Sequence, residues 1–461
     1  MHGTISARHL VLFLVEDAVI LVAVVVALLL RFGPEAVALL TDGGEWFRIA
    51  TIVLVTQASF YYHDLYELHV LNSRREFFVR LLQALGVASI VLALLYFAFP
   101  DLILGRGVFA IFLVVAIGVI VLWRLAYTAV LSSRGLSVNL LLVGAGELAR
   151  QIYRDCLTRR TLGFRVIGCL AGDPAEAAKN QEGLPPVLGG FEDLAVVGRR
   201  RGIDRIVVAI GERRGKFPVR DLLELRVSGH PVEDGCEFYE ELTGKILVEH
   251  LRPSQLIFSD GFSKGRLTMT VKRAVDLLAS ALGVLAALPV WLLVPVAIKL
   301  DSPGPVLFRQ ERTGRRGKPF QVLKFRSMRA GAEEESGPVW AQDGDGRVTR
   351  VGRVIRKTRI DELPQLINVL KGEMSFVGPR PERPFFIEQL AERIPYYLQR
   401  HSVKPGLTGL AQVKYSYGST VEDAVEKLRY DLFYIKRMSI WMDLAIIFET
   451  VKVVLFGKGA K

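Results

Sequence analysis

Two adjacent carboxylates, Asp361 and Glu362, stand in a strongly basic part of the sequence. They occur in the stretch T-R-I-D-E-L-P-Q-L-I-N-V-L-K-G-E-M-S-F-V-G-P-R-P, which ends in a Gly-Pro-Arg-Pro turn carrying Arg380. Because nearby cations favour the charged form of a carboxylate, we expect both acids to be ionised. An ionised carboxylate can attack phosphorus or bind Mg²⁺, and an arginine held between two prolines can contact a phosphate. The stretch therefore predicts phosphoryl-transfer chemistry.

The same acids also allow a purely structural interpretation. Asp361 is a favoured N-cap residue for a helix running to about Leu370, and Glu362 would complement the dipole of that helix. Pro364 would be tolerated in its first turn. This interpretation explains the acids but not the cations that precede them, which are Arg353, Arg356, Lys357 and Arg359.

A second basic segment precedes this stretch. From Asp301 onward the sequence is dense in Gly, Pro and Arg, and the apolar alternation of V-L-F and F-Q-V-L-K-F predicts two short strands around the basic turn Arg312–Lys318. Lys324, Arg326 and Arg329 follow. These cations could face anionic lipid headgroups, hold a diphosphate, or do both.

One long apolar segment, residues 272–299, lies directly before the basic region. Its length suits a membrane-spanning helix, but basic residues flank both ends and Pro289 lies in its middle. A crossing would also place the remaining domain outside the cell, away from nucleotide substrates. We therefore expect a re-entrant helix that bends at Leu288–Pro289, with a simple spanning helix as the alternative.

The first 130 residues contain four further apolar runs. They are roughly Leu10–Leu30, Phe47–Phe60, Leu81–Phe99 and Val108–Leu131, of which the second is the shortest. We expect a four-helix transmembrane bundle rather than buried helices of a large soluble core. The positive-inside rule, applied to Arg74, Arg75, Arg80 and Arg134, places both ends of the bundle in the cytoplasm.

Composition narrows the function further. Of 461 residues 51% are hydrophobic, and the net charge of +12 fits an anionic partner such as a lipid phosphate or a nucleotide. The three cysteines lack paired spacing, which predicts neither disulfides nor a metal cluster. We expect no cleaved signal peptide at the start of the sequence.

A middle segment has the pattern of a nucleotide-binding unit. V-N-L-L-L-V-G-A-G-E-L-A-R (Val138–Arg150) predicts a strand, a glycine turn and a helix, with G-x-G-x-x-A at Gly144, Gly146 and Ala149. A second strand, Phe164–Asp173, ends on Asp173, where a ribose-binding carboxylate would lie, and Arg205–Ile210 continues a parallel sheet. The turn could also serve packing alone, so the fold is Rossmann-like whether or not a ligand binds.

The last part of the chain resembles a known family, the bacterial sugar transferases, or monotopic phosphoglycosyl transferases. The resemblance covers about residues 272–457, and the bundle and middle unit resemble the large members associated with exopolysaccharide or exosortase loci. The motifs that carry it are K-R-A-V-D, G-P-V-L-F-R-Q-E-R-T-G, F-Q-V-L-K-F-R-S-M, D-E-L-P-Q-L-I-N-V-L-K-G-E-M-S-F-V-G-P-R-P and K-P-G-L-T-G-L-A-Q-V. It implies an α/β protein with a membrane bundle (1–134), a Rossmann-like domain (135–262) and a membrane-embedded α+β catalytic domain (263–461).

The resemblance also implies a reaction. Asp361 would attack the β-phosphate of a UDP-sugar and release UMP, and undecaprenyl phosphate would then take the sugar-1-phosphate, with Glu362 assisting and Mg²⁺ at Asp361. The expected phosphate contacts are Arg380, Lys324, Arg326 and Arg359. The site would face the cytoplasm at the bacterial inner membrane and start exopolysaccharide or O-antigen repeats.

The expected partners follow from the same resemblance. They are membrane lipid, downstream glycosyltransferases and a second copy of the chain in a homodimer, but no nucleic acid.

Two other function classes stay open at this point. A membrane-anchored NAD(P)-dependent nucleotide-sugar oxidoreductase or dehydratase would act through Gly144–Ala149, but no tyrosine is followed by lysine four residues on. A non-catalytic scaffold is disfavoured by the intact Asp361-Glu362 pair and Arg380.

Overall fold

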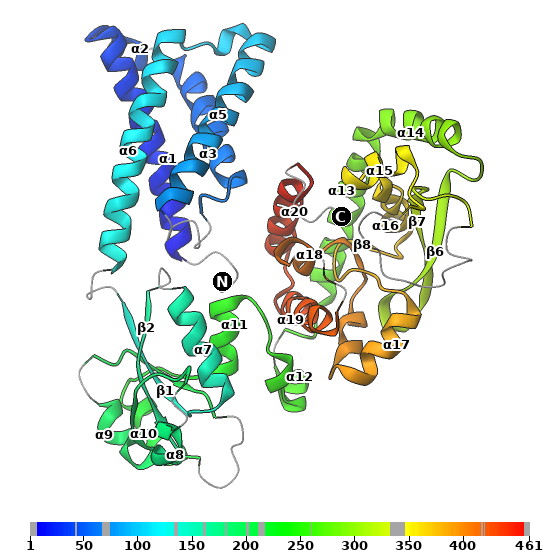
Figure 1. Ribbon diagram of the computed structural model, residues 1–461. Coiled ribbons are helices and arrows are strands. Elements are labelled where there is room, and N and C mark those ends of the chain that lie inside the picture. Colours follow the sequence, from blue (N-terminus) through cyan, green and yellow to red (C-terminus); the bar gives the residue numbers. More distant parts are fainter. Residues whose placement is uncertain are drawn as a thin grey trace. The chain divides into compact units, whose positions relative to one another are not determined.

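The computed structural model divides the chain into two compact units, Met1–Phe238 and Tyr239–Lys461 (Figure 1). The first unit holds the helical bundle and the parallel sheet, and the second holds the basic region with Asp361. The structure describes residues 7–41, 44–66, 74–132, 137–159, 163–179, 182–199, 202–210, 217–259, 261–331, 346–415, 418 and 420–455. Arg134, used above for orientation, lies outside them.

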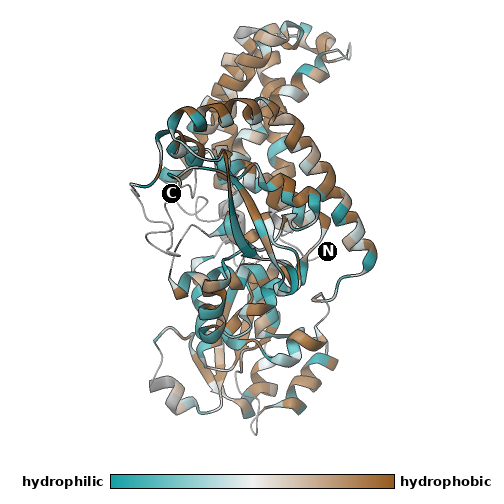
Figure 2. Ribbon diagram, turned by 90° about the vertical axis from the view of Figure 1, so that its right-hand side faces the viewer, coloured by the Kyte–Doolittle hydropathy of each residue, from teal (hydrophilic) through white to brown (hydrophobic). Residues whose placement is uncertain are grey.

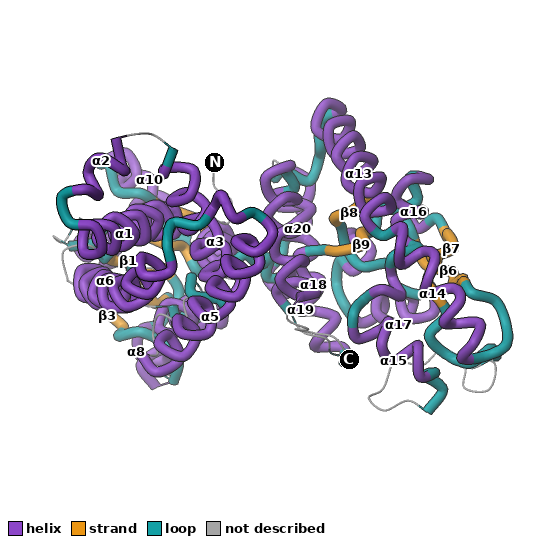
Figure 3. Tube along the Cα trace, turned by 90° about the horizontal axis from the view of Figure 1, so that it is seen from above, coloured by secondary structure: helices purple, strands orange, loops and turns teal. Residues whose placement is uncertain are grey.

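Among the described residues, five helices form the bundle: α1 (Ala7–Phe32), α2 (Glu35–Thr41), α3 (Glu45–Tyr62), α5 (Arg74–Ala98) and α6 (Arg106–Ser132). Seen from above, α1 lies beside α6 and α3 beside α5 (Figure 3). The helices at the top of Figure 2, which belong to this bundle, are coloured mostly as hydrophobic. Continuous Leu, Val, Ile and Ala runs explain why these segments are helical and apolar on all faces.

Three helices of the bundle are long and apolar enough to cross a membrane, at Phe13–Phe32, Arg75–Ala98 and Gly107–Tyr127. They correspond to three of the four expected spans. The remaining one, Phe47–Phe60, falls within α3 and does not meet the same standard among the described residues. Glu45, Arg48 and Gln57 within this 18-residue helix explain the difference.

A fully buried ion pair lies in the described part of the bundle core. Arg124 Nε lies 2.5 Å from Glu16 Oε1, with both side chains nearly inaccessible to solvent. The guanidinium also lies over the rings of Tyr66 and Phe77, at 5.5 and 5.4 Å from their centroids. Such pairs are kept because removing one partner leaves an uncompensated buried charge, so this pair fixes α1 against α6.

The sheet of the first unit is parallel throughout. Its strands are β1 (Val138–Val143), β2 (Phe164–Ala171), β3 (Val187–Gly190), β4 (Arg205–Val208) and β5 (Val232–Asp234), in the order β3-β2-β1-β4-β5. The order reverses at β1, as in doubly wound α/β folds. Helices α7 (Glu147–Thr158), α8 (Pro174–Lys179), α9 (Leu194–Gly198), α10 (Val219–Val227) and α11 (Gly235–Thr243) alternate with the strands. The expected parallel sheet is therefore confirmed.

The second unit combines helices with two small sheets. β6 (Leu307–Thr313) and β7 (Pro319–Phe325) form the antiparallel hairpin that the sequence predicts, and β8 (Ser375–Val377) pairs in parallel with β9 (Gly406–Thr408). The remaining helices are α12 (Pro253–Phe258), α13 (Arg266–Ala286), α14 (Leu288–Asp301), α15 (Arg350–Lys357), α16 (Gln365–Lys371), α17 (Pro384–Arg393), α18 (Leu410–Lys414), α19 (Val421–Arg437) and α20 (Ile440–Leu455). Its main core joins α17, α19 and α20 through Phe386, Leu428, Leu432, Tyr434 and Met442.

The apolar segment 272–299 is a bent helix pair. α13 and α14 meet at Ala287 with an angle of 60° between them. The break falls one residue before the expected Leu288–Pro289 position, because Pro289 occupies the first turn of α14, where its missing N–H costs nothing. The bend agrees with either a re-entrant loop or a broken span.

The bent pair is polar inside and apolar outside. On α13, Lys272, Asp276 and Ser280 are buried against the rest of the unit, at a spacing of four residues that places them on one face. The outer surface of α13 and α14 carries exposed apolar side chains, namely Leu277, Leu278, Leu282, Leu285, Leu288, Leu292, Leu293, Val296 and Leu300. An exposed apolar surface of this extent marks a membrane or protein contact.

Candidate active site

Asp361 and Glu362 lie in a short 3-10 turn, Ile360–Glu362, between α15 and α16. The turn begins after Arg359, which has a left-handed backbone with φ of 59°. α16 begins later, at Gln365, and its N-cap is Pro364, so the predicted capping role of Asp361 is wrong. Left-handed non-glycine residues cost about 1 to 2 kcal/mol and persist where surrounding structure enforces them. The left-handed residue Arg359 thus directly precedes the turn that carries the two carboxylates.

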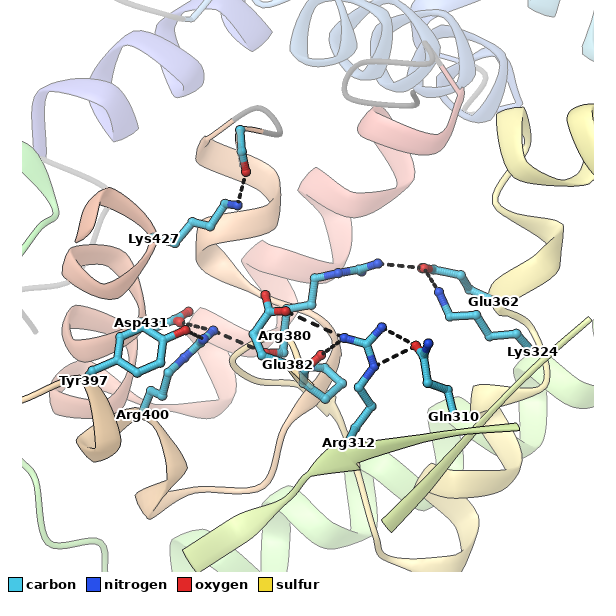
Figure 4. A network of polar contacts seen from close by, with 12 residues as sticks. Gln310, Arg312, Lys324, Glu362, Arg380, Glu382, Tyr397, Arg400, Lys427 and Asp431 are labelled. Carbon is cyan, nitrogen blue, oxygen red and sulfur yellow. Dashed lines mark hydrogen bonds and ion pairs between the residues drawn. The ribbon is translucent and has the colours of Figure 1, made fainter. Parts of the chain in front are cut away.

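Glu362 is clamped by two cations. Lys324 Nζ from β7 and Arg380 Nη2 from the turn after β8 each donate to Glu362 Oε1 at 2.9 Å (Figure 4). The Glu362 side chain is 12% exposed, so solvent screens these ion pairs only weakly. The structure thus brings together four predicted site residues: Asp361, Glu362, Lys324 and Arg380.

Asp361 has a different setting from its neighbour. The residue is 8% exposed. Among the residues that the structure describes, no cation lies within ion-pair distance of its carboxylate. Lys324, Arg356 and Arg359 act on it only through longer-range attraction.

The pKa values of the two acids move in opposite directions. Burial raises the pKa of Asp361, the negative charge of Glu362 raises it further, and Lys324 opposes both. Burial would also raise the pKa of Glu362, but Lys324, Arg380 and Arg359 outweigh it and hold that pKa well below its ordinary range. The sequence predicts that the surrounding cations favour the ionised form of both carboxylates. In the structure they lower the pKa of Glu362, whereas the pKa of Asp361 is raised. A carboxylate with a lowered pKa is a weak base.

Arg326, which the sequence placed among the phosphate contacts, hydrogen-bonds at the end of α14 rather than to Asp361 or Glu362 in the described part of the chain. Its guanidinium donates to the carbonyl oxygens of Ser302 and Pro303 at 2.7 and 2.8 Å and reaches that of Ile298 at 3.5 Å. The residue is only 5% exposed. It therefore holds the C-terminal end of α14, whose last carbonyls lack helical partners.

Arg359 occupies the position between α15 and the 3-10 turn, and its charge acts on both Asp361 and Glu362. Its side chain is half-buried. The sequence-based grouping of Arg359 with the phosphate contacts stays a prediction.

Three further cations, not predicted from the sequence as site residues, surround the Gly-Pro-Arg-Pro turn. Lys272 Nζ donates to Val377 O at 3.1 Å, Arg312 Nη1 to Pro381 O at 3.1 Å, and Arg400 Nη2 to Arg380 O at 3.2 Å. Lys272 was read only as the start of an apolar segment and Arg312 as part of a basic turn. Their targets lie 105, 69 and 20 residues away in the chain, so no local pattern could have indicated these contacts.

In the first unit, the glycine motif follows β1 as predicted, and Gly144 packs closely against the residue after β4. Gly144 has φ of 125°, and a Cβ there would lie 2.5 Å from Ala209 O, so only glycine fits. Ala149 is buried in α7, and Gly146 precedes that helix. Asp173 Oδ1 accepts a hydrogen bond from Ala175 N at 3.0 Å, which caps the start of α8.

Within the described residues no group of three or more His, Cys, Asp and Glu could hold a metal ion. Mg²⁺ differs from the metals that need such groups, since one or two carboxylates together with substrate phosphates suffice. Asp361, without a cation at ion-pair distance in the described part of the chain, fits that pattern, whereas Glu362 is occupied by Lys324 and Arg380.

Comparisons with known proteins give two family matches. Residues 267–457 match a family model described as bacterial sugar transferase, and residues 62–223 match one described as CoA-binding domain. The first match contains the whole cluster around Asp361. The second contains the bundle's last two helices and four of the five described strands of the parallel sheet.

Several curated relatives are similar to this chain. An Aeromonas hydrophila protein named UDP-N-acetylgalactosamine-undecaprenyl-phosphate N-acetylgalactosaminephosphotransferase is 45% identical over 231 residues, 50% of this chain and 54% of the relative. A Komagataeibacter xylinus undecaprenyl-phosphate glucose phosphotransferase is 36% identical over 341 residues, 71% of this chain and 61% of the relative.

A third relative is matched over more of its length. A Caulobacter vibrioides UDP-glucose:undecaprenyl-phosphate glucose-1-phosphate transferase is 50% identical over 193 residues, 41% of this chain and 71% of the relative. This chain thus spans less than two thirds of the first two relatives, at 54% and 61% of their lengths.

Proposed function

The chain belongs to the bacterial sugar transferase family, and from this premise we propose that it transfers a hexose-1-phosphate from a UDP-sugar to undecaprenyl phosphate. The relatives described above are named for sugar-phosphate transfer to undecaprenyl phosphate. The observation that supports the proposal most directly is the contrast between the two acids. Glu362 is clamped by Lys324 and Arg380, while Asp361 lies beside it with no cation at ion-pair distance among the described residues.

In the first step, an oxygen of the ionised Asp361 carboxylate attacks the β-phosphorus of the UDP-sugar. A bond forms between that oxygen and phosphorus, and the bond from phosphorus to the bridging oxygen breaks. UMP leaves with the bridging oxygen and its electron pair. The result is a sugar-phosphoryl aspartate, which divides one difficult displacement into two easier ones.

In the second step, a phosphate oxygen of undecaprenyl phosphate attacks the same phosphorus. The acyl-phosphate bond breaks, Asp361 regains its carboxylate, and undecaprenyl-diphospho-sugar leaves. Neither step requires a general base, because both nucleophiles are anions. We therefore assign Glu362 the role of orienting Lys324 and Arg380 rather than that of moving a proton.

Lys324 and Arg380 would neutralise charge on the diphosphate as it reacts. Two cations fixed on one carboxylate are already oriented when substrate arrives, so little reorganisation is needed. When bound, Mg²⁺ would supply further charge neutralisation at the diphosphate, and Asp361 would be its protein ligand.

Membrane helices and the exposed apolar surface of α13 and α14 suit a lipid-linked acceptor. The site would work at the cytoplasmic face of the bacterial inner membrane, where both UDP-sugars and undecaprenyl phosphate are met. The NAD(P)-dependent alternative receives no support from the site, since Gly144 packs against Ala209 and Asp173 caps α8.

The test is UMP release by the purified full-length protein with undecaprenyl phosphate and a panel of UDP-sugars. We expect release with one or a few sugars, together with a sugar-phosphate adduct on the peptide containing Asp361 by mass spectrometry. Absence of UMP release across UDP-hexoses and UDP-N-acetylhexosamines would overturn the proposal.

A further inference from the structure

The turn that carries Arg380 is unusual in how its backbone is held. Pro379 and Pro381 have no N–H, so they cannot donate to a ladder that would fix this segment. Its carbonyl oxygens nevertheless need donors, because a buried unpaired carbonyl is costly. Three carbonyls, those of Val377, Arg380 and Pro381, accept from cationic side chains.

Each of these cations also has its own acidic partner. Lys272 Nζ lies 2.6 Å from Asp443 Oδ2, Arg400 Nη2 lies 2.8 Å from Asp431 Oδ2, and Arg312 Nη1 lies 3.6 Å from Glu382 Oε2. Figure 4 shows the second and third of these pairs on either side of the Arg380 backbone.

Tyrosine hydroxyls contact two of these three ion pairs, Arg400–Asp431 and Lys272–Asp443. Tyr397 OH accepts from Arg400 Nη1 at 2.6 Å, and Tyr434 OH lies 2.7 Å from Asp443 Oδ1 and 3.1 Å from Val377 O. Lys272, Arg400, Asp431, Asp443 and both tyrosines are at most 6% exposed.

Stability alone does not account for this arrangement. Replacing a buried ion pair with packed apolar residues is often neutral or stabilising, because the charges no longer lose hydration. What apolar residues cannot do is donate hydrogen bonds to a fixed set of carbonyl oxygens. Arg400, with its planar fork, reaches Tyr397, Asp431 and the Arg380 carbonyl at once.

We infer that Lys272, Arg312 and Arg400 are positioning residues that fix the Arg380 backbone, so that its guanidinium meets the diphosphate without rearrangement. The inference rests on the proposed function, since it concerns the substrate contact of that site. Ordering a long side chain on binding costs free energy, and a turn fixed beforehand reduces that cost. Loss of the fixation should therefore weaken diphosphate binding more than it slows the chemical steps.

The experiment is a double-mutant cycle on the full-length protein in detergent, with two readouts. One is the dissociation constant of UDP by calorimetry, and the other is KM and kcat for UMP release. The variants are Arg400→Lys, which keeps the charge but loses the fork, Arg380→Ala, and the two combined. Arg429→Lys is the matched control, because Arg429 lies on the same helix as Asp431 but pairs with Glu249 and Glu426.

We expect Arg400→Lys to raise KM and the UDP dissociation constant about tenfold, with kcat changed less than about threefold. In the Arg380→Ala background the same change should have less than about a twofold effect, because the residue acts through Arg380. The control should match wild type. Equal effects of Arg400→Lys with and without Arg380, or a fall in kcat at unchanged KM, would overturn the inference.

A second variant covers the case in which Arg400→Lys does not fold. Tyr434→Phe removes one hydroxyl from the Lys272 group, and it should raise KM about threefold with Arg380 present and leave it unchanged without Arg380. No change in either background would overturn the inference for that group. Failure of the proposed function looks different: wild type would then release no UMP from any UDP-sugar. If the wild type still bound UDP, the UDP dissociation constants of the double-mutant cycle would test the inference on their own. If the wild type did not bind UDP, both the proposed function and the inference would be overturned.

Discussion

Asp361 and Glu362 are neighbours in the chain, yet the two cations at hydrogen-bonding distance, Lys324 and Arg380, lie 2.9 Å from one oxygen of Glu362. Burial raises the pKa of Asp361, whereas the cations lower that of Glu362. Two adjacent acids of similar chemistry thus have two distinct environments in the folded chain. The more basic carboxylate, Asp361, is the one suited to attack phosphorus, and the weaker base organises the cations.

Asp361→Asn should abolish transfer. An amide has no anionic oxygen to attack phosphorus, so we expect UMP release to fall about a thousandfold or more and the covalent adduct to disappear. Asp221→Asn, on α10 of the other compact unit, is the control with the same chemical change. Near-normal turnover of Asp361→Asn would contradict the covalent mechanism.

The pH dependence should report the coupling between the two acids. Asp361 must be ionised to attack, and burial together with the charge of Glu362 raises its pKa, so the acid limb of kcat/KM should lie above the ordinary range of an aspartate. Glu362→Gln removes that neighbouring negative charge and releases Lys324 and Arg380. The pKa of Asp361 should then fall, and the acid limb should move to lower pH.

The measurement is the pH dependence of kcat/KM for the wild type and for Glu362→Gln. We also expect Glu362→Gln to reduce the rate at neutral pH about 10- to 100-fold, because both cations lose their anchor. An acid limb that stays in place or moves to higher pH would show that Glu362 does not act on Asp361 in this way.

Substitutions of Lys324 and Arg326 should have different effects, the first on substrate binding and the second on stability. Lys324→Met should raise KM for the UDP-sugar about tenfold, since it removes a charge from the site. Arg326→Met should leave KM within about threefold but lower the melting temperature by about 5 °C, because the carbonyls of Ser302 and Pro303 lose their donor. A large KM effect of Arg326→Met at unchanged melting temperature would restore Arg326 to the phosphate contacts.

The glycine turn of the first unit offers a matched pair of substitutions. Gly144→Ala places a methyl group 2.5 Å from Ala209 O at φ of 125°, whereas Gly146→Ala meets nothing within 4 Å. We expect the first to destabilise the sheet by about 1 to 3 kcal/mol and the second to be nearly neutral. Thermal unfolding followed by circular dichroism distinguishes them, and equal melting temperatures would show that the turn is not held against β4.

The bend between α13 and α14 makes a topological prediction. A re-entrant pair returns to the face from which it enters, so cysteines introduced as Thr268→Cys and Pro305→Cys should react from the same side of sealed vesicles. Their labelling by a membrane-impermeant maleimide, before and after permeabilisation, measures this. Labelling from opposite sides would mean that the pair is one broken span.

Local patterns predicted much of the secondary structure. Strands β1, β2 and β4 and the hairpin β6–β7 fall where apolar alternation and turn residues place them, because strand patterns depend on near neighbours. The bend near Pro289 was predicted for the same reason, since proline acts on its own helix.

The site itself was predictable in part. Asp361, Glu362, Lys324 and Arg380 were named from residue type and setting, but the division of the cations between the two acids was not. That division, the destination of Arg326 and the role of Arg400 depend on hydrogen bonds between residues that lie 18 to 38 positions apart. No local pattern contains that information, which exists only once the chain has folded.

α13 has a consequence for any attempt to simplify this protein. Its exposed leucines could be replaced by other apolar side chains. The buried face could not, because Asp276 Oδ1 accepts from Ser375 Oγ and Phe376 N, and Lys272 donates to Val377 O. Removing α13 to obtain a water-soluble fragment would therefore remove three hydrogen bonds to β8. A water-soluble version must retain Lys272 and Asp276. Its solubility has to come from replacing the exposed apolar side chains of α13 with polar ones.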